Sequence, residues 1–251
     1  MTHSLMRHTL TTLAAIALAA LTACSKPYVR PYDWRSEQAA VETLAARAES
    51  IRSIQAACAL TLTDPRGETV NFDGALVFEL KDNQPRLRLR TWKLGQAVFD
   101  ATVREDGVWL MTSEQAAQRM PADGLQRARP EQIAQAISLL TGDFFRDPRL
   151  VLTTTPELTA TRPIDSGTIV ATIDRATLTV IKYSIRDEHN RERQALHLDT
   201  YRELGPNATP FPLRIRAVGE HGSAEVRLQD VELNGPIQPA AFTPPRRAVK
   251  Q

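Results

Sequence analysis

Apolar and polar side chains alternate with a period of two along much of this chain, and this feature most constrains its fold. The alternation is clearest in residues 72–80 and 86–90, where leucine and phenylalanine alternate with charged or small residues. Successive side chains of a β-strand point to opposite faces, so each run predicts a strand with one apolar face. Two more strands are predicted near residues 97–104 and 108–112, joined by a Glu-Asp-Gly turn.

A strand is also predicted from Gln55, where the period changes to two. Six further strands are predicted in the second half of the chain, which brings the total to about eleven. They lie near residues 150–155, 167–173, 178–186, 194–201, 213–218 and 224–233. Residues 206–212 (PNATPFP) are predicted to form a proline-rich connection between two of these strands.

Two amphipathic helices are predicted from apolar residues at three- and four-residue steps. The first has an N-cap at Ser36 and runs to about Ile54. The second opens at Pro130, a residue favoured at the first helical position, and reaches Phe144. Each helix has an apolar stripe that must pack on another apolar surface, so both are expected to cover the sheet.

These elements predict an α+β fold in which a strongly curved antiparallel sheet is covered by two or more helices. Sheets of many strands curl because strands twist, so the sheet is expected to form a half-open β-barrel. Its concave apolar face must either be filled by side chains or hold a ligand. The candidate ligand-binding residues are Phe72, Leu76, Phe78, Leu87 and Leu89 on the sheet, with Ile137 and Leu140 on the second helix, which would act as a lid.

The N-terminal segment has the organisation of a secretory signal peptide. A basic residue, Arg7, precedes the apolar run Leu10–Cys24, and this run is shorter than the roughly 20 residues needed to cross a bilayer. It ends in Leu-Thr-Ala-Cys, which resembles a bacterial lipobox, where cleavage precedes the cysteine and acyl chains are attached to it. The sequence therefore predicts a lipid anchor at Cys24. The alternative is an ordinary secretory signal with a chance cysteine.

The predicted organisation is a signal peptide at 1–23, a lipidated tether at 24–35, a single half-barrel domain at 36–245 and a frayed tail at 246–251. The tether contains prolines and aromatic residues without an apolar period, and it is expected to be extended and partly disordered. Its aromatic residues Tyr28, Tyr32 and Trp34 are predicted either to rest at the level of the lipid headgroups or to pack onto the body. Removal of residues 1–23 leaves 228 of the 251 residues, which is enough for one large domain.

The charge balance gives no argument for nucleic acid as a partner. The segment 1–23 holds one basic residue and no acidic one, so 30 of the 31 basic residues and all 29 acidic residues remain after cleavage. No basic block is present to neutralise phosphates. Rows of arginines at 86–90 and 214–216 predict either a solvated face or a salt-sensitive surface for anionic headgroups or a partner.

The sequence carries no recognisable motif for catalysis or for binding a metal or cofactor. Its five histidines include no pair at the spacing of metal ligands, and Cys58 has no CxxC partner. A nucleophile elbow, a phosphate-binding glycine loop and a dinucleotide fingerprint are also missing. We therefore expect no enzyme activity and no cofactor. Cys58, flanked by apolar residues, is expected to be a small buried hydrophobe.

Several short phrases resemble the bacterial lipoprotein-localisation superfamily, which includes the LolA-like periplasmic carrier and the LolB-like outer-membrane receptor. Together they cover most of residues 38–245, and the order of lipobox, helix, strands and central helix is also similar. The phrases are Leu94–Phe99, Asp106–Leu110, His197–Tyr201, Pro210–Ile215, Val231–Asn234 and Phe242–Pro245.

This resemblance implies a half-open barrel with a helical lid, whose cavity takes the acyl chains of a client lipoprotein. The lipid anchor favours similarity to the receptor over the soluble carrier. The receptor's protruding loop with an exposed leucine has no clear match in the sequence. The segment Arg90–Gln96 offers Trp92 or Leu94 as a candidate insertion loop.

The predicted function is that of a membrane-anchored periplasmic lipoprotein that binds acyl chains of a lipid or an acylated client protein, in lipoprotein localisation to the outer membrane. Ser25 after the anchor, in place of aspartate, resembles the outer-membrane pattern of enteric bacteria. The outer membrane is therefore favoured over the inner membrane. The alternative is a non-catalytic scaffold or interaction lipoprotein whose cavity is filled by its own side chains.

Overall fold

The computed structural model describes residues 29–82, 84–112, 139, 141, 143–220, 222–245 and 249–250. In this part of the chain, no helix is long and apolar enough to cross a membrane. The elements in chain order are α2 (Glu37–Glu49), β1 (Ser53–Thr63), β2 (Thr69–Lys81), β3 (Gln84–Lys93), β4 (Gln96–Arg104), β5 (Gly107–Thr112), the 3₁₀ helix η1 (Asp143–Arg146), β6 (Val151–Thr153), β7 (Thr159–Ile164), β8 (Gly167–Asp174), β9 (Thr179–Arg186), β10 (Glu192–Leu204), β11 (Thr209–Gly219), β12 (Gly222–Leu233), the 3₁₀ helix η2 (Pro239–Phe242) and β13 (Val249–Lys250).

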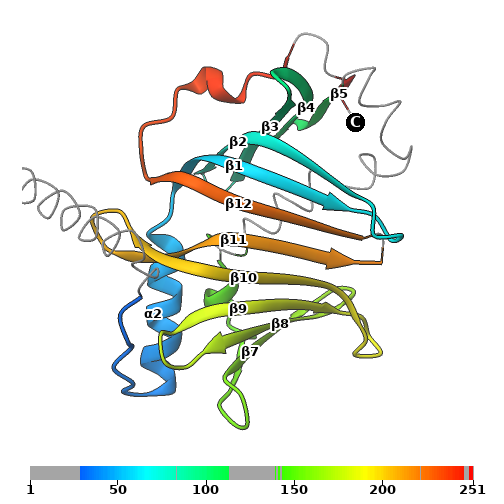
Figure 1. Ribbon diagram of the computed structural model, residues 1–251. Helices are drawn as coiled ribbons and strands as arrows, with labels where there is room; N and C mark the ends of the chain where they lie inside the picture. Colours follow the sequence, from blue (N-terminus) through cyan, green and yellow to red (C-terminus); the bar gives the residue numbers. More distant parts are fainter. Residues whose placement is uncertain are drawn as a thin grey trace, which may run out of the picture.

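The strands form one antiparallel sheet of thirteen strands, in the order β13-β5-β4-β3-β2-β1-β12-β11-β10-β9-β8-β7-β6 (Figure 1). Consecutive strands pair within β1–β5 and within β6–β12, and β12 returns to pair with β1. β1 therefore lies near the middle of the sheet. The two ends of the order do not pair with each other, so the sheet stays open, consistent with the predicted half-open barrel.

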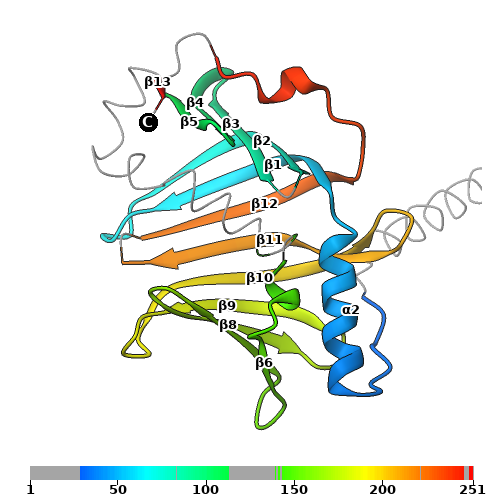
Figure 2. The ribbon, with the colours of Figure 1, turned by 180° about the vertical axis from the view of Figure 1, so that it is seen from behind.

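The sheet twists strongly along this order and is covered on one face. In Figure 1, β8–β12 run across the view while β3–β5 run steeply, as expected from the twist between neighbouring strands. Figure 2 shows α2 and η1 on the same side of the sheet. We call this the inner face; the alternate residues of each strand that point to it form a continuous hydrophobic core with α2 and η1. The predicted alternation of apolar and polar faces is confirmed.

Helix α2 is shorter than the sequence predicts. Ser36 is its N-cap as expected, with the Ser36 side chain accepting a hydrogen bond of 3.1 Å from the Ala39 N–H. The helix ends at Glu49, whereas the periodicity predicts about Ile54. Ile54 lies in β1 and pairs with Phe78 and Leu233. An isoleucine at this spacing fits the apolar face of a helix, but its β-branched side chain also fits a β-strand.

The prediction of two or more covering helices is not matched. Among the described residues, α2 is the only α-helix with both ends defined. Most of the second predicted helix, including Ile137 and Leu140, lies outside the described residues; Leu139 and Thr141 are helical, and Phe144 lies in η1. The lid assigned to residues 130–144 therefore stays a prediction.

Strand β11 corrects the prediction of a proline-rich connection at 206–212. The turn occupies only Gly205–Ala208, and Pro210 and Pro212 lie in β11, paired with Glu203 and Tyr201 of β10. β12 pairs with β11 only from Arg214 onward. The prolines thus lie where one side of the strand is unpaired, and there a missing N–H breaks no ladder bond.

Two strands were not predicted from the sequence, which accounts for the difference between eleven and thirteen. β7 contains Pro163 and pairs with β8 through a short hairpin. β13 is formed by the second- and third-last residues of a tail expected to be frayed, and it pairs with the edge strand β5. Such a cover protects backbone groups that an edge strand would otherwise leave unpaired.

Candidate functional site

The five sheet residues predicted to bind ligand share the inner face but are fully packed. Phe78 pairs with Leu87, and Leu76 pairs with Leu89. Phe78, Leu87 and Leu89 have no exposed surface, and Leu76 and Phe72 are only 3% and 6% exposed. These residues therefore form a closed apolar core over β2 and β3, and no open cavity borders them on the inner face among the described pockets.

The inner face holds a small cavity at a different place, between α2 and strands β9–β11. Its volume is about 50 Å³, space for a few water-sized groups at most. The helix, the 3₁₀ segment and the strands all contribute to its wall, which includes Leu44, Ile51, Phe145, Leu178, Val180, Tyr183, Tyr201 and Phe211. None of the five sheet residues predicted to bind ligand lines this cavity.

Two tyrosines in the cavity wall have their hydroxyls occupied by backbone carbonyls. Tyr183 donates to the Leu139 carbonyl at 3.0 Å, and Tyr201 donates to the Val180 carbonyl at 2.5 Å. Burial raises the pKa of both Tyr183 and Tyr201 well above the ordinary value, so both stay neutral. Because the hydroxyls are satisfied, these rings present apolar surface to the cavity.

Aromatic and charged contacts hold the elements around the cavity together. The Phe144 ring packs edge-on against Tyr183, with the ring centroids 5.3 Å apart. Arg47 of α2 donates to the Thr177 and Leu178 carbonyls at 3.2 and 2.6 Å, which ties the helix to the β8–β9 turn. Arg146 of η1 forms an ion pair with Glu49 of α2. Both partners of this pair are substantially exposed, so it adds little stability.

The predicted insertion loop is the tip of the β3–β4 hairpin. Leu94 is 94% exposed, the most exposed of the large apolar side chains described. Leu94 and Gly95 have φ angles of 50° and 77°, as in the two-residue turns that join twisted strands. Asparagine or glycine adopts a positive φ angle at the first position of the turn more easily than leucine does. Leu94 is therefore unfavourable there both for its backbone angle and for its exposed apolar side chain.

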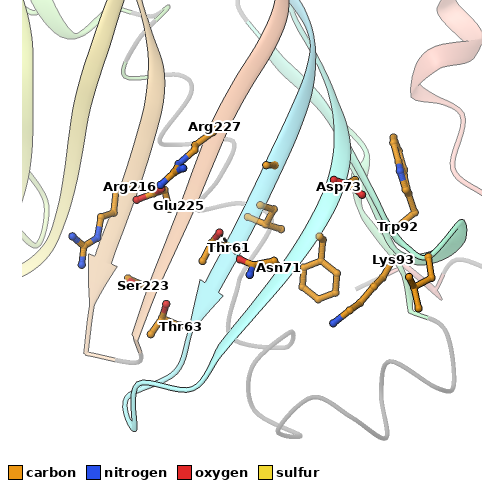
Figure 3. Close-up of a pocket in the computed structure, with 14 residues that line it drawn as sticks. Thr61, Thr63, Asn71, Asp73, Trp92, Lys93, Arg216, Ser223, Glu225 and Arg227 are labelled. Carbon is orange, nitrogen blue, oxygen red and sulfur yellow. Dashed lines mark hydrogen bonds and ion pairs between the residues drawn. The ribbon is translucent and has the colours of Figure 1, made fainter.

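A groove of about 690 Å³ lies beside this tip on the outer face of the sheet. Figure 3 shows its polar side chains arranged across neighbouring strands, with Trp92 and Lys93 at one side and Arg216 at the other. Thr61 donates to the Asn71 amide oxygen at 2.7 Å on its floor. The three predicted residues Phe72, Trp92 and Leu94 all border this groove, although Phe72 is buried.

The predicted arginine rows are largely occupied by ion pairs within the protein. Arg88 binds Asp100, which is 1% exposed, at 2.8 Å, and also donates to the Ala241 carbonyl of η2 at 3.0 Å. The Asp100 carboxylate raises the pKa of Arg88. Arg214 binds Glu225 at 2.8 Å, and its guanidinium lowers the pKa of that carboxyl. These contacts hold η2 on the outer face and join β11 to β12.

Cys58 and the acidic residues give no sign of reactive chemistry in the described part of the chain. Cys58 is buried, as predicted, and burial raises the pKa of its thiol to about 11. No group of three or more His, Cys, Asp or Glu residues there is placed to hold a metal ion.

Solved structures place this fold in a known class. A DUF1329 family protein from Desulfovibrio piger aligns with a TM-score of 0.57 at 10% identity, covering 82% of this chain and 96% of that protein. A putative outer membrane lipoprotein-sorting protein domain from Vibrio parahaemolyticus gives 0.53 at 12% identity, covering 81% and 94%. A LolA superfamily protein from Nitrosomonas europaea gives 0.51 at 10% identity, covering 81% and 97%.

The chain therefore has the LolA/LolB-like fold of lipoprotein-sorting proteins, as the sequence resemblance implies. Identities of 10–12% show a shared fold and no more. No family model matches the chain, and no curated protein sequence matches it.

Proposed function

We propose that this chain is a lipoprotein of the cell envelope, acylated at Cys24 and facing the periplasm, that binds acyl chains of a lipid or lipoprotein. The observation that carries the proposal is the cavity between α2 and β9–β11, whose walls are mainly apolar. Both of its tyrosine hydroxyls already have partners, so the wall favours hydrocarbon over polar groups. Each buried CH₂ of an acyl chain contributes about 0.8 kcal/mol.

A whole acyl chain needs more room than the cavity offers, so the proposal requires part of its wall to move. The helix α2 and the segment η1 meet through the exposed ion pair of Arg146 and Glu49 and through apolar contacts. Breaking an exposed ion pair costs at most about 1 kcal/mol. We therefore expect the acyl chain to enter by displacing η1, while β9–β11 and α2, which Arg47 ties to the β8–β9 turn, stay in place.

The exposed Leu94 supports a contact with lipid or an acylated client at the β3–β4 tip. A leucine at a positive φ angle and 94% exposure is unfavourable for folding and hydration. Strained residues of this kind are typical of sites where the strain serves binding. Leu94, with Trp92 next to it, is thus proposed as the point where the ligand is first met.

The proposed location is the outer membrane, because Ser25 follows the anchor residue. A role in lipoprotein localisation accords with the shared fold. Binding rather than catalysis is proposed, since the candidate site is a mainly apolar cavity whose tyrosine hydroxyls are engaged.

The proposal is tested by mass spectrometry of lipid extracted from the purified chain from residue 25 onward. This form lacks Cys24 and keeps residues 29–35, which contact the body. Acyl lipid at a defined ratio to protein, displaced by added acylated peptide, supports the proposal. A lipid-free, folded protein that also ignores acylated peptide contradicts it.

A second candidate is a scaffold lipoprotein with a filled core. The complete burial of Phe78, Leu87 and Leu89 favours this alternative, because the β2–β3 part of the inner face leaves no space for a ligand. The lipid-free result described above would select it.

A further inference from the structure

The segment Val29–Arg35, here called the strap, is bound to the body, which is one of the two alternatives predicted for its aromatic residues. The Arg30 backbone N–H donates to Glu203 at 2.9 Å, and the Arg30 Nε lies 3.0 Å from both oxygens of that carboxylate. This contact lowers the pKa of Glu203. Two residues on, the Tyr32 N–H donates to the Ala176 carbonyl at 2.7 Å.

Aromatic contacts fix the second half of the strap. The Tyr32 and Trp34 rings pack edge-on with their centroids 6.0 Å apart, and both are half-buried against the core. The Arg175 guanidinium lies 4.6 Å from the centre of the Trp34 ring. The strap is therefore attached at both the β8–β9 turn, through Arg175 and Ala176, and the end of β10, through Glu203.

These attachment points lie at one end of the sheet, and the Leu94 tip lies at the other. Glu203 and Asn207 belong to the β10–β11 hairpin, which in Figure 1 projects from the end opposite the β11–β12 and β1–β2 turns. Figure 3 shows Lys93, next to Leu94, at the end where Thr63 and Ser223 lie. Strand β1, with 11 residues, spans about 35 Å between these two ends.

The length of chain before the strap limits how far a lipid anchor at Cys24 can lie from it. Arg30 is the sixth residue after Cys24, so the reach is at most about 20 Å. If the strap were released as far as Ser36, twelve residues would span about 40 Å. A bound strap therefore keeps the anchor near the β10–β11 hairpin.

We infer that the strap orients the anchored protein, so that the end carrying the β8–β9 and β10–β11 turns faces the lipid surface and the Leu94 tip faces away from it. The inference rests on acylation of Cys24, which belongs to the proposed function. Its partner surface is the headgroup layer of the anchoring membrane. Leu94 then contacts a ligand that arrives from the aqueous side, because the bound strap keeps the Leu94 tip away from the anchoring leaflet.

The test uses the full acylated chain in vesicles of phosphatidylethanolamine and phosphatidylglycerol that contain a headgroup-nitroxide lipid. A fluorophore is attached to a single introduced cysteine, in Asn207→Cys or in Leu94→Cys. Cys58 is buried with a raised pKa and should remain unlabelled. Loss of emission at position 207, with unchanged emission at position 94, is expected. Equal loss at both positions, or loss only at 94, overturns the inference.

Release of the strap gives a second measurement. Glu203→Ala combined with Trp34→Ala removes side-chain contacts at both attachment points and should reduce the difference between the two labels, because the tether lengthens. The matched control is Glu220→Ala, which removes the exposed Arg193 ion pair and should leave the difference unchanged. If both variants behave like the original chain, the strap does not set the orientation.

Flotation with the vesicles separates failure of the anchor from failure of the orientation. The full chain should float and Cys24→Ser should not. A chain that does not float overturns the anchor and the inference together. A chain that floats with the opposite labelling pattern overturns the inference alone and leaves acyl-chain binding at the inner cavity unaffected.

Discussion

The two halves of the inner face are both apolar, yet they are packed differently. On β2–β4, apolar side chains pack directly across neighbouring strands: Leu87 lies between Phe78 and Val103, and Leu89 between Leu76 and Ala101. Against β9–β11, α2 meets the rigid rings of Tyr183 and Tyr201, and a cavity of about 50 Å³ remains. Hydroxyl hydrogen bonds hold the Tyr183 and Tyr201 rings in place, so these rings are less free than Leu87 and Leu89 to shift into the remaining space.

The outer face reinforces this difference. η2 lies over β3 and β4, where Arg88 joins the buried Asp100 to the Ala241 carbonyl. η2 thus covers β3 and β4 on the outer face. A ligand that needs a movable wall is therefore better accommodated on the β9–β11 half, next to α2 and η1.

The largest expected effect is the loss of stability when the packed half is truncated. Leu87→Ala or Leu89→Ala should lower the free energy of unfolding by about 2–5 kcal/mol, because each residue is fully buried and leaves a void. Urea unfolding of the chain from residue 25 onward measures this loss. Acyl lipid bound per folded protein should stay the same. Lost lipid binding with little change in stability would move the site to β2–β4.

Filling the cavity should separate ligand binding from stability. Val180→Phe adds volume at the cavity wall and should abolish acyl-lipid binding, with a loss of stability of about 1–3 kcal/mol at most. Ile181→Phe is the matched control, because Ile181 is 44% exposed and does not line the cavity. Unchanged lipid binding in Val180→Phe would place the ligand elsewhere.

The tip of the packed half offers a change that should increase stability. Leu94→Asn places a residue that tolerates a positive φ angle at a position with φ of 50°, so the free energy of unfolding should rise by about 0.5–1 kcal/mol. The rate of acyl-lipid uptake should fall, because the apolar contact is lost. Val151→Asn, at another exposed apolar position, should change neither quantity by much. A destabilised Leu94→Asn would contradict the assignment of strain to this turn.

The smallest effect is expected at the boundary between the halves, where Arg214 of β11 and Arg227 of β12 bind Glu225. The contact lowers the pKa of Glu225 below its ordinary value of 4.5. The stabilisation is therefore present above pH 4.5 and is lost as the pH falls through the lowered pKa. At neutral pH, Glu225→Gln should cost about 0.2–1 kcal/mol.

The pH dependence of this variant provides its own check. The difference between the original chain and Glu225→Gln, measured by urea unfolding, should shrink steadily below pH 4.5. Glu188→Gln in the exposed β9–β10 turn is the control, with little expected change at any pH. A difference that grows on acidification would show that the carboxylate does not stabilise the folded state.

The sequence was sufficient to predict the sheet because its signal is local. Period-two alternation placed Phe78 and Leu87 on one face, and the structure confirms this. It failed where one residue suits two structures, as at Ile54, and where pairing overrides composition, as at Pro210 and Pro212. The sequence leaves the placement of the strap undecided for a related reason: its contacts with Ala176 and Glu203 join residues far apart in the chain.

The location of the cavity could not be predicted from the sequence. Tyr183 and Tyr201 look like ordinary strand residues there, and only the packing of α2 against β9–β11 leaves space beside them. Hydrophobicity alone instead pointed to Leu87 and Leu89, which the structure buries completely. For the β3–β4 tip, the sequence offers Trp92 and Leu94 as two candidates and does not choose between them. The choice depends on which residues form the turn, and the pairing of β3 with β4 determines this.

The most direct test of the central claim is to map where an acyl chain is bound. A fatty acid with a photoreactive diazirine in its tail is added to the chain from residue 25 onward and cross-linked, and the modified peptides are identified by mass spectrometry. We predict modification in α2 and β9–β11, suppressed in Val180→Phe and retained in Ile181→Phe. Modification confined to the outer groove beside Trp92, or none at all, would contradict the account.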